Sequence, residues 1–111
     1  MQTSTDEAFL LLEDWRSNGT PLRIIAVMQE GRAIGQPFDG FLLAANKNSG
    51  VLKFQAARSD GGSEIEEFDL ADASFDYFEP GRDIVVQNED WHCFLKVSLF
   101  PGGMILIAVP R

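Results

Sequence analysis

Short apolar runs dominate the sequence after Pro21, and turn residues separate them at a spacing of about ten positions, as in all-β proteins. Runs rich in β-branched and aromatic residues are typical of strands. The clearest runs are 22–28, 41–45, 51–57, 64–70, 91–100 and 104–109, with weaker ones at 33–38 and 75–78. Seven or eight short strands in this order predict an antiparallel β-meander that forms a small, partly closed barrel.

One helix is expected before the strands. Ser4-Thr5-Asp6-Glu7 fits a capping box, in which the Ser4 side chain accepts from the Glu7 amide and Glu7 reaches back. An apolar stripe follows at helical spacing, and Asn18-Gly19 with Pro21 ends the helix. The stripe consists of Ala8, Leu11, Leu12 and Trp15, widened by Phe9 and Leu10, which also need burial. The predicted fold class is mainly β (α+β), with a helix at about 5–17 and strands from about 22 to 109.

The chain has 111 residues, with 9 Lys and Arg against 17 Asp and Glu, which gives a formal net charge of −8. This length predicts one domain, 1–111, large enough for a core that needs no disulfide or metal. The acidic balance argues against nucleic acids and membrane surfaces as partners. A polar N-terminus, short apolar runs and a single cysteine lead us to expect a soluble, cytoplasmic protein.

The stretch from Leu22 to about Glu79 resembles the Sm-like proteins, in which a capped helix runs into a bent five-stranded meander. In that resemblance 22–28 is the first strand, Gly31-Arg32 the turn, Gly35 the strand glycine and Phe38-Asp39 the pair before the third strand. Leu43 stands where the family has an asparagine, and the family's basic RNA-contacting residues have no counterpart. The resemblance therefore implies an architecture and carries over no functional residue.

Two groups of residues are candidates for chemistry. His92 and Cys93 are adjacent, but neighbours in a strand point to opposite faces, so we expect Cys93 in the core and His92 outside it. Residues 60–83 hold nine acids and one base, Arg82, which we interpret as a solvated surface. A divalent ion or a basic protein partner are the alternatives for this stretch. No catalytic or metal-ligating residue is assigned, and no cofactor is expected.

Residues 104–109 are apolar at every position, although a strand with one side in water alternates. One side of this strand can meet the core, and the other must meet the N-terminal helix or a second chain. A two-fold homodimer covers such a surplus most simply. The predicted interface residues are Phe94, Phe100, Ile105 and Ile107.

These patterns favour a small bacterial domain that acts as a protein-interaction or oligomerisation module without enzymatic activity. Its expected partner is a second copy or another protein. One alternative is an Sm-like nucleic-acid-binding barrel, in which Trp91, Phe94 and Phe100 stack on bases. The other is a small enzyme that depends on carboxylates or on a metal.

Overall fold

The computed structural model describes residues 2–27, 38–57, 60–70, 72–78, 91–99 and 103–110. This part of the chain contains one helix and eight strands. In chain order they are β1 (Gln2–Thr3), α1 (Thr5–Asn18), β2 (Leu22–Val27), β3 (Phe38–Asn46), β4 (Val51–Ala57), β5 (Ser63–Asp69), β6 (Ser74–Phe78), β7 (Trp91–Ser98) and β8 (Met104–Pro110).

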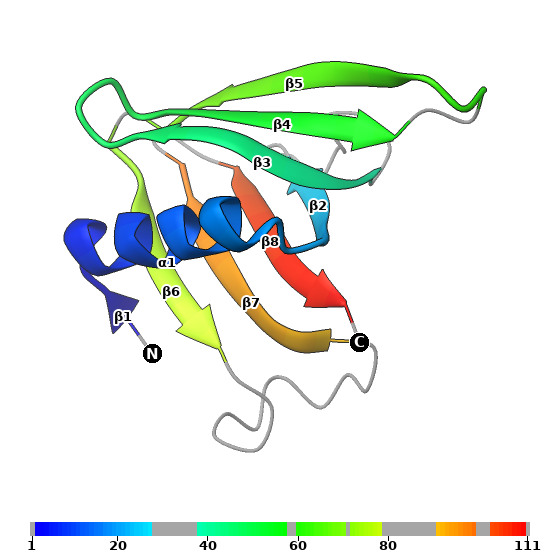
Figure 1. Ribbon diagram of the computed structural model, residues 1–111. Coiled ribbons are helices and arrows are strands. Elements are labelled where there is room, and N and C mark those ends of the chain that lie inside the picture. The colour runs from blue at the N-terminus through cyan, green and yellow to red at the C-terminus, as the bar shows by residue number, and fades with distance from the viewer. Residues whose placement is uncertain are drawn as a thin grey trace.

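The eight strands form one antiparallel sheet in the order β1-β6-β7-β8-β2-β3-β4-β5. It consists of two meanders, β2 to β5 and β6 to β8, which are joined where Ile24 of β2 faces Ile107 of β8. The sheet bends strongly, so that β3, β4 and β5 lie over β6, β7 and β8 (Figure 1). It does not close, because β1 and β5 end it on either side. The mainly β fold with an N-terminal helix is confirmed, and the expected barrel is found only in part.

Local sequence explains the ends of α1. The Ser4 hydroxyl accepts from the Glu7 amide at 3.1 Å and also donates to the Glu7 carboxylate at 3.1 Å. This caps the helix where the capping sequence predicts. Gly19 ends the helix with a left-handed φ of 62°, a conformation that costs glycine little.

The loop between β3 and β4 is also a local feature. The Asn46 side chain accepts from the Asn48 amide at 2.9 Å and from the Ser49 amide at 3.2 Å. Gly50 then takes a φ of 74° before β4 begins. The hairpin predicted around residues 46–50 is confirmed. β3 starts at Phe38, three residues before the expected strand, and residues 33–37 of the weaker expected strand lie outside the described residues.

The core lies between α1 and the concave side of the sheet, which we call the inner side (Figure 1). Ala8, Phe9, Leu12 and Trp15 of α1 are buried there, and the ring of Phe9 meets Phe75 of β6 edge-on at 5.9 Å. The expected burial of Leu10 is wrong: its side chain is 71% exposed. Leu10 is two residues from Leu12, about 200° around the helix axis, and therefore points away from the sheet.

Candidate functional site

The predicted interface residues Ile105 and Ile107 lie on the inner side of β8. They are 1% and 0% exposed, and both belong to the core that α1 covers. The prediction that Ile105 and Ile107 contact another chain needs correction, because the core of their own chain buries both side chains. Phe100 lies outside the described residues. Phe94 is half-buried on the opposite side of the sheet, with its ring stacked on that of Phe78 at 4.8 Å.

The convex, outer side of β8 carries the other half of the apolar run. Cross-strand register places Leu106 between Ile25 of β2 and Lys96 of β7, and places Ala108 beside Phe94. We name the six apolar side chains on this side the apolar outer face; they are Ile25, Phe78, Phe94, Met104, Leu106 and Ala108. Ala108 is 3% exposed, and the other five are half-buried.

No described helix covers the apolar outer face. α1 packs on β3 and β6, and its buried side chains join the core on the inner side. In the described part of the chain, β7 and β8 have their main contacts with neighbouring strands of the sheet. The helix α1 therefore covers the inner side of β8 and leaves the outer side of this strand uncovered.

The charges beside the apolar outer face come in opposite pairs. Asp76 of β6 lies directly across from Lys96 of β7. At the β2 end, Arg23 holds Asp39 in a two-pronged ion pair, with Nε to Oδ1 at 2.7 Å and Nη2 to Oδ2 at 3.0 Å. These hydrogen bonds, and the positive charge behind them, lower the pKa of the Asp39 carboxyl. Among the described residues named here, two acids are matched by two bases, although the chain as a whole carries −8.

A second outward surface was not predicted from the sequence. Phe41 and Leu43 of β3 and Ile65 of β5 are 45%, 42% and 66% exposed. The available signal was that Ile65 shares one side of its strand with Glu67, whereas Phe68 and Leu70 share the other side with Glu66, so Ile65 belongs to the more polar side.

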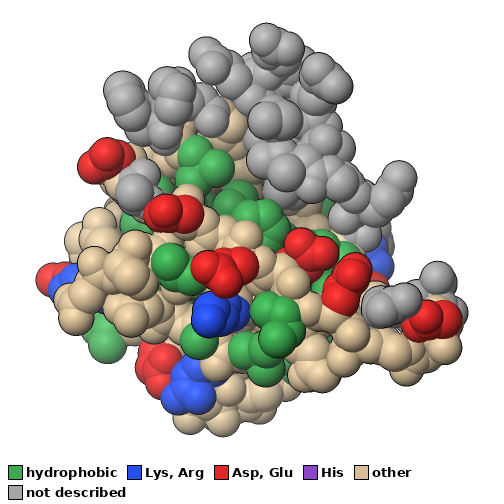
Figure 2. Space-filling view, turned by 90° about the horizontal axis from the view of Figure 1, so that it is seen from above, with side chains coloured by type: hydrophobic (Ala, Val, Ile, Leu, Met, Phe, Trp, Pro, Cys, Tyr) green, Lys and Arg blue, Asp and Glu red, His purple; other side chains and the backbone are tan. Residues whose placement is uncertain are grey.

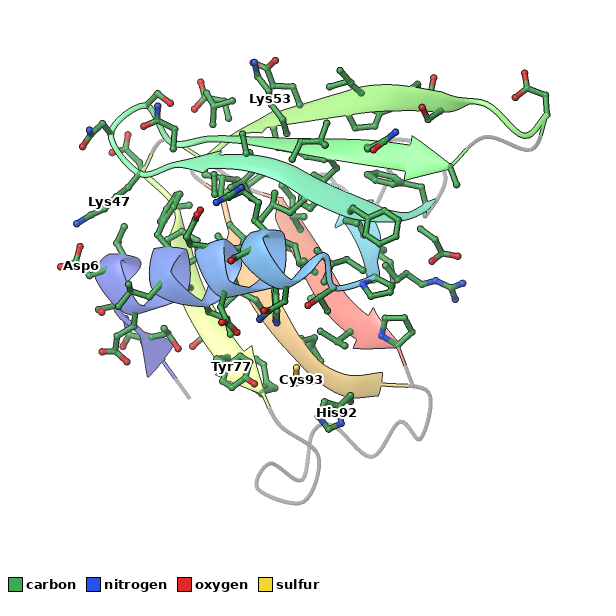
Figure 3. All side chains as sticks on the ribbon, in the orientation of Figure 1. Asp6, Lys47, Lys53, Tyr77, His92 and Cys93 are labelled. Atoms are coloured by element: carbon green, nitrogen blue, oxygen red, sulfur yellow. The ribbon has the colours of Figure 1, made fainter. Side chains whose placement is uncertain are left out.

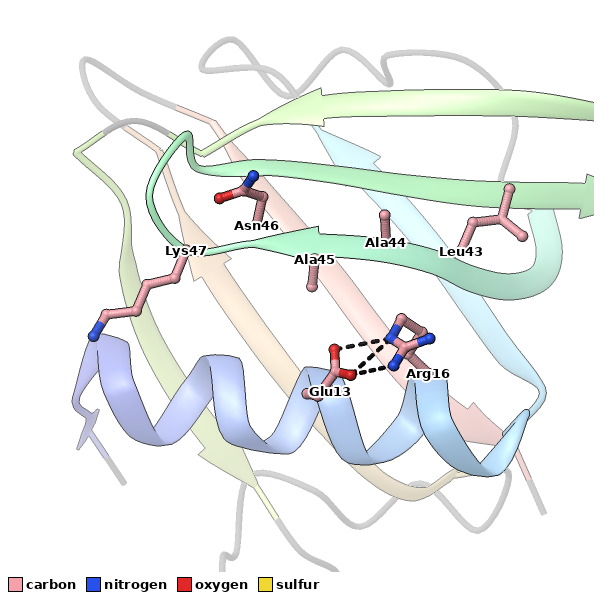
Figure 4. A pocket seen from close by; sticks show the side chains of 7 residues that line it. All are labelled: Glu13, Arg16, Leu43, Ala44, Ala45, Asn46 and Lys47. Carbon is pink, nitrogen blue, oxygen red and sulfur yellow. Dashed lines mark hydrogen bonds and ion pairs between the residues drawn. The ribbon is translucent and has the colours of Figure 1, made fainter.

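An open groove runs between α1 and β3 (Figure 4). Glu13 and Arg16 line it and pair with each other, with Arg16 Nε donating to both Glu13 oxygens at 2.9 Å. That hydrogen bond and the adjacent positive charge lower the pKa of Glu13. The two side chains satisfy one another, so the groove presents no unmatched charge to a ligand from this pair.

His92 and Cys93 do not form a nucleophile and base. Cys93 is 6% exposed and His92 is exposed, as the alternation of a strand predicts. Figure 3 shows the side chains of His92 and Cys93 pointing in opposite directions from β7. The prediction that Cys93 belongs to the core is confirmed.

Within the described ranges, no group of three or more His, Cys, Asp or Glu side chains is placed to hold a metal ion. None of the helices described there has the length and apolar character needed to cross a membrane. Comparison with protein families, with curated proteins and with solved structures finds no match. The resemblance to Sm-like proteins stays a prediction, and Gly31, Arg32 and Gly35, on which it partly rests, lie outside the described residues.

Proposed function

We propose that this protein is an interaction module that forms a two-fold homodimer through the apolar outer face. The observation that carries the proposal is the outward row of β8, where Met104, Leu106 and Ala108 are apolar at successive outward positions. A strand whose outer side meets water alternates with polar residues, so this row favours a covered surface.

Charge supports a second copy as the partner. Two copies that each carry −8 repel one another, and they can approach best where the local charge is balanced. The apolar outer face is such a place. In an interface with two-fold symmetry, Lys96 of one copy can meet Asp76 of the other, and the reverse contact forms at the same time.

The size of the face limits the affinity. Four strands about 4.8 Å apart and five residues of about 3.3 Å each give roughly 320 Å² of sheet per copy. A standard interface buries about 800 Å² on each partner. We therefore expect a weak dimer, with a dissociation constant on the order of 100 μM, or about −5.5 kcal/mol.

Sedimentation over a range of concentrations tests the proposal. The wild-type mass should rise from that of a 12.3 kDa monomer towards twice that value. Leu106→Thr, which introduces a β-branched side chain that suits a strand and removes apolar surface, should hold the protein in the monomeric form. Leu43→Thr is the matched control, because it makes the same change on the outer side of β3 and should leave the dimer intact.

Salt and charge reversal provide two further checks. Added salt should strengthen the dimer, because it screens the repulsion between two copies that each carry −8, which exceeds the attraction of the two Lys96–Asp76 contacts. Lys96→Glu should weaken the dimer, and Lys96→Glu with Asp76→Lys should restore it. A wild-type protein that stays monomeric at about 500 μM, well above the expected dissociation constant, overturns the proposal.

A further inference from the structure

β5 is the last strand at one end of the sheet, and it is long and regular. In the described part of the chain its one neighbouring strand is β4, and the two pair along all seven residues of β5 without a bulge. The other end of the sheet finishes in β1, which has only two residues. Figure 1 shows β5 as the outermost strand of the layer that β3, β4 and β5 form. An edge of this kind can pair with another extended chain.

The hydrogen bonds between β4 and β5 determine which backbone groups point towards this edge. One step beyond the last pair of the ladder, the Leu70 amide donates to the Gly50 carbonyl at 2.7 Å, so these two residues form a hydrogen-bonded pair. Antiparallel strands alternate hydrogen-bonded and non-hydrogen-bonded pairs. Even-numbered residues of β5 therefore direct their backbone groups to β4, whereas Ile65 and Glu67 direct theirs away from it, towards a further strand.

Side chains on both sides of β5 border a strand added at this edge, because such a strand lies in the plane of the sheet. On one side are Glu64, which is exposed, and Glu66, which is half-buried; they lie across from Ala56 and Phe54 of β4 and face no base there. Between them, on the other side, Ile65 is 66% exposed. Figure 2, which looks down on this layer, shows acidic side chains in a row beside hydrophobic ones. The edge thus offers an acid, an aliphatic residue and an acid in succession.

The β5 strand of a second copy does not fit this edge. Antiparallel pairing of two such edges requires the residues that direct their backbone groups outward to face one another. In the three registers with the longest overlap, Glu66 then lies opposite Glu66, Glu64 opposite Glu66, or Glu67 opposite Glu67. Like charges directly opposite one another destabilise a strand pair. A strand that pairs here must therefore have a different sequence.

We propose that the edge of β5 binds an extended basic segment of another protein, which adds a strand antiparallel to β5. An aliphatic residue of the segment exchanges backbone hydrogen bonds with Ile65. The Lys or Arg residues on either side of it lie opposite Glu64 and Glu66, in non-hydrogen-bonded pairs, where side chains approach most closely. This edge does not include β6, β7, β8 or β2, which carry the apolar outer face, so the two proposals stand or fall independently.

Two labelled peptides of identical composition test the backbone pairing on the full chain. Both are capped ten-residue peptides of alternating Lys and Val, and they differ only in which amide nitrogens are methylated. Methyl groups on the Val amides remove the donors that face Ile65 and Glu67, whereas methyl groups on the Lys amides lie on the far side of the added strand. In fluorescence anisotropy the Lys-methylated peptide should bind like the unmodified one, and the Val-methylated peptide at least about tenfold more weakly.

Charge substitutions then locate the peptide on the edge. Glu64→Gln with Glu66→Gln keeps the size of both side chains and should weaken the unmodified peptide about tenfold. The matched control is Glu13→Gln with Asp14→Asn, which removes two acids from α1 and should change binding less than about twofold. Both double variants change the net charge equally, so a difference between them assigns the effect to β5.

Two further measurements report on the edge itself. Addition of the unmodified peptide should slow amide hydrogen exchange at Ile65 and Glu67 more than at Glu64 and Glu66, whose amides already bond to β4. Ile65→Pro removes an outward donor and no bond to β4, so the free protein should stay folded and bind the peptide at least about tenfold more weakly. Ile65→Ala keeps the donor and should lose less.

Four outcomes overturn the proposal. They are equal binding of the two methylated peptides, equal effects of the β5 and α1 double variants, unchanged exchange at Ile65 and Glu67 with about 1 mM unmodified peptide, and protection of those amides that rises with protein concentration alone. The last outcome would assign the edge to a second copy. Leu106→Thr should leave peptide binding unchanged, which separates failure here from failure of the dimer.

Discussion

Phe78 and Phe94 lie directly across from each other on neighbouring strands, with their rings stacked at a centroid distance of 4.8 Å and an interplanar angle of 28°. Both side chains are half-buried on the outer side of the sheet. The stack anchors β6 to β7 at the end of their pairing.

A double-mutant cycle measures this stack. Phe78→Leu and Phe94→Leu keep apolar surface at both positions but remove the ring contact. We expect a coupling free energy of about 0.5–1.5 kcal/mol in urea unfolding, typical of aromatic pairs. Substitution effects that simply add would show that the two rings contribute only their separate burial.

The ion pair between Arg23 and Asp39 predicts a dependence of stability on pH. Arg23 lowers the pKa of Asp39 in the folded state, so the pair stabilises the fold above the pKa of the unfolded chain, near 4. That contribution is lost as the pH falls through the lower folded-state pKa. Both side chains are about half exposed, which limits the contribution to less than about 1 kcal/mol.

Asp39→Asn should therefore lower the free energy of unfolding at neutral pH by less than about 1 kcal/mol and have a smaller effect in strong acid. Carboxyl chemical shifts provide a direct check, because the Asp39 titration midpoint should rise in Arg23→Gln. An unchanged midpoint in that variant would show that the guanidinium does not stabilise the carboxylate.

Gly40 is expected to tolerate no side chain. It is paired with β2 on one side and β4 on the other, and a Cβ built there would clash with the backbone carbonyl of Gln55. Gly40→Ala should destabilise the fold by about 3 kcal/mol or more, because backbone atoms of β4 would have to move. Gly19→Ala is the comparison: space is open there, and only the left-handed backbone costs energy, about 1 kcal/mol. Equal unfolding midpoints for the two variants would contradict this account.

Cys93 should react slowly with thiol reagents in the native protein, because its side chain is 6% exposed and packed in the core. Cys93→Ser should destabilise the fold by about 1–3 kcal/mol, since it buries a hydroxyl group among apolar side chains. Cys93→Ala should cost less. A native labelling rate equal to that of the urea-unfolded chain would place Cys93 at the surface.

Local features were predictable from the sequence because neighbouring residues determine them. The Ser4 cap, the Gly19 stop and the Asn46 loop each depend on side chains within a few positions of the backbone that they bond. The C-terminal hairpin was predictable for the same reason, since 99–103 joins two complementary runs.

The order of strands and the sides of β8 were not predictable. The pairing of Ile24 with Ile107 joins residues far apart in the sequence, and no local signal specifies it. In 104–109 both alternating sets are apolar, so the pattern has no contrast to show that Ile105 and Ile107 face the core while Leu106 faces outward. Which of the two sets faces the core depends on the side of the sheet against which α1 packs.

The central position of β8 has a consequence for how the chain reaches its folded state. β8 is among the last segments of 1–111 to leave the ribosome, yet it joins the two meanders as the neighbour of both β2 and β7. Until it emerges, β2 presents an unpaired backbone edge, the kind of edge that recruits other extended chains. Synthesis adds roughly 5–20 residues per second, so the β2 edge stays open for several seconds on every nascent chain. The sheet order therefore makes pairing with other extended chains most favourable in the interval before β8 is synthesised.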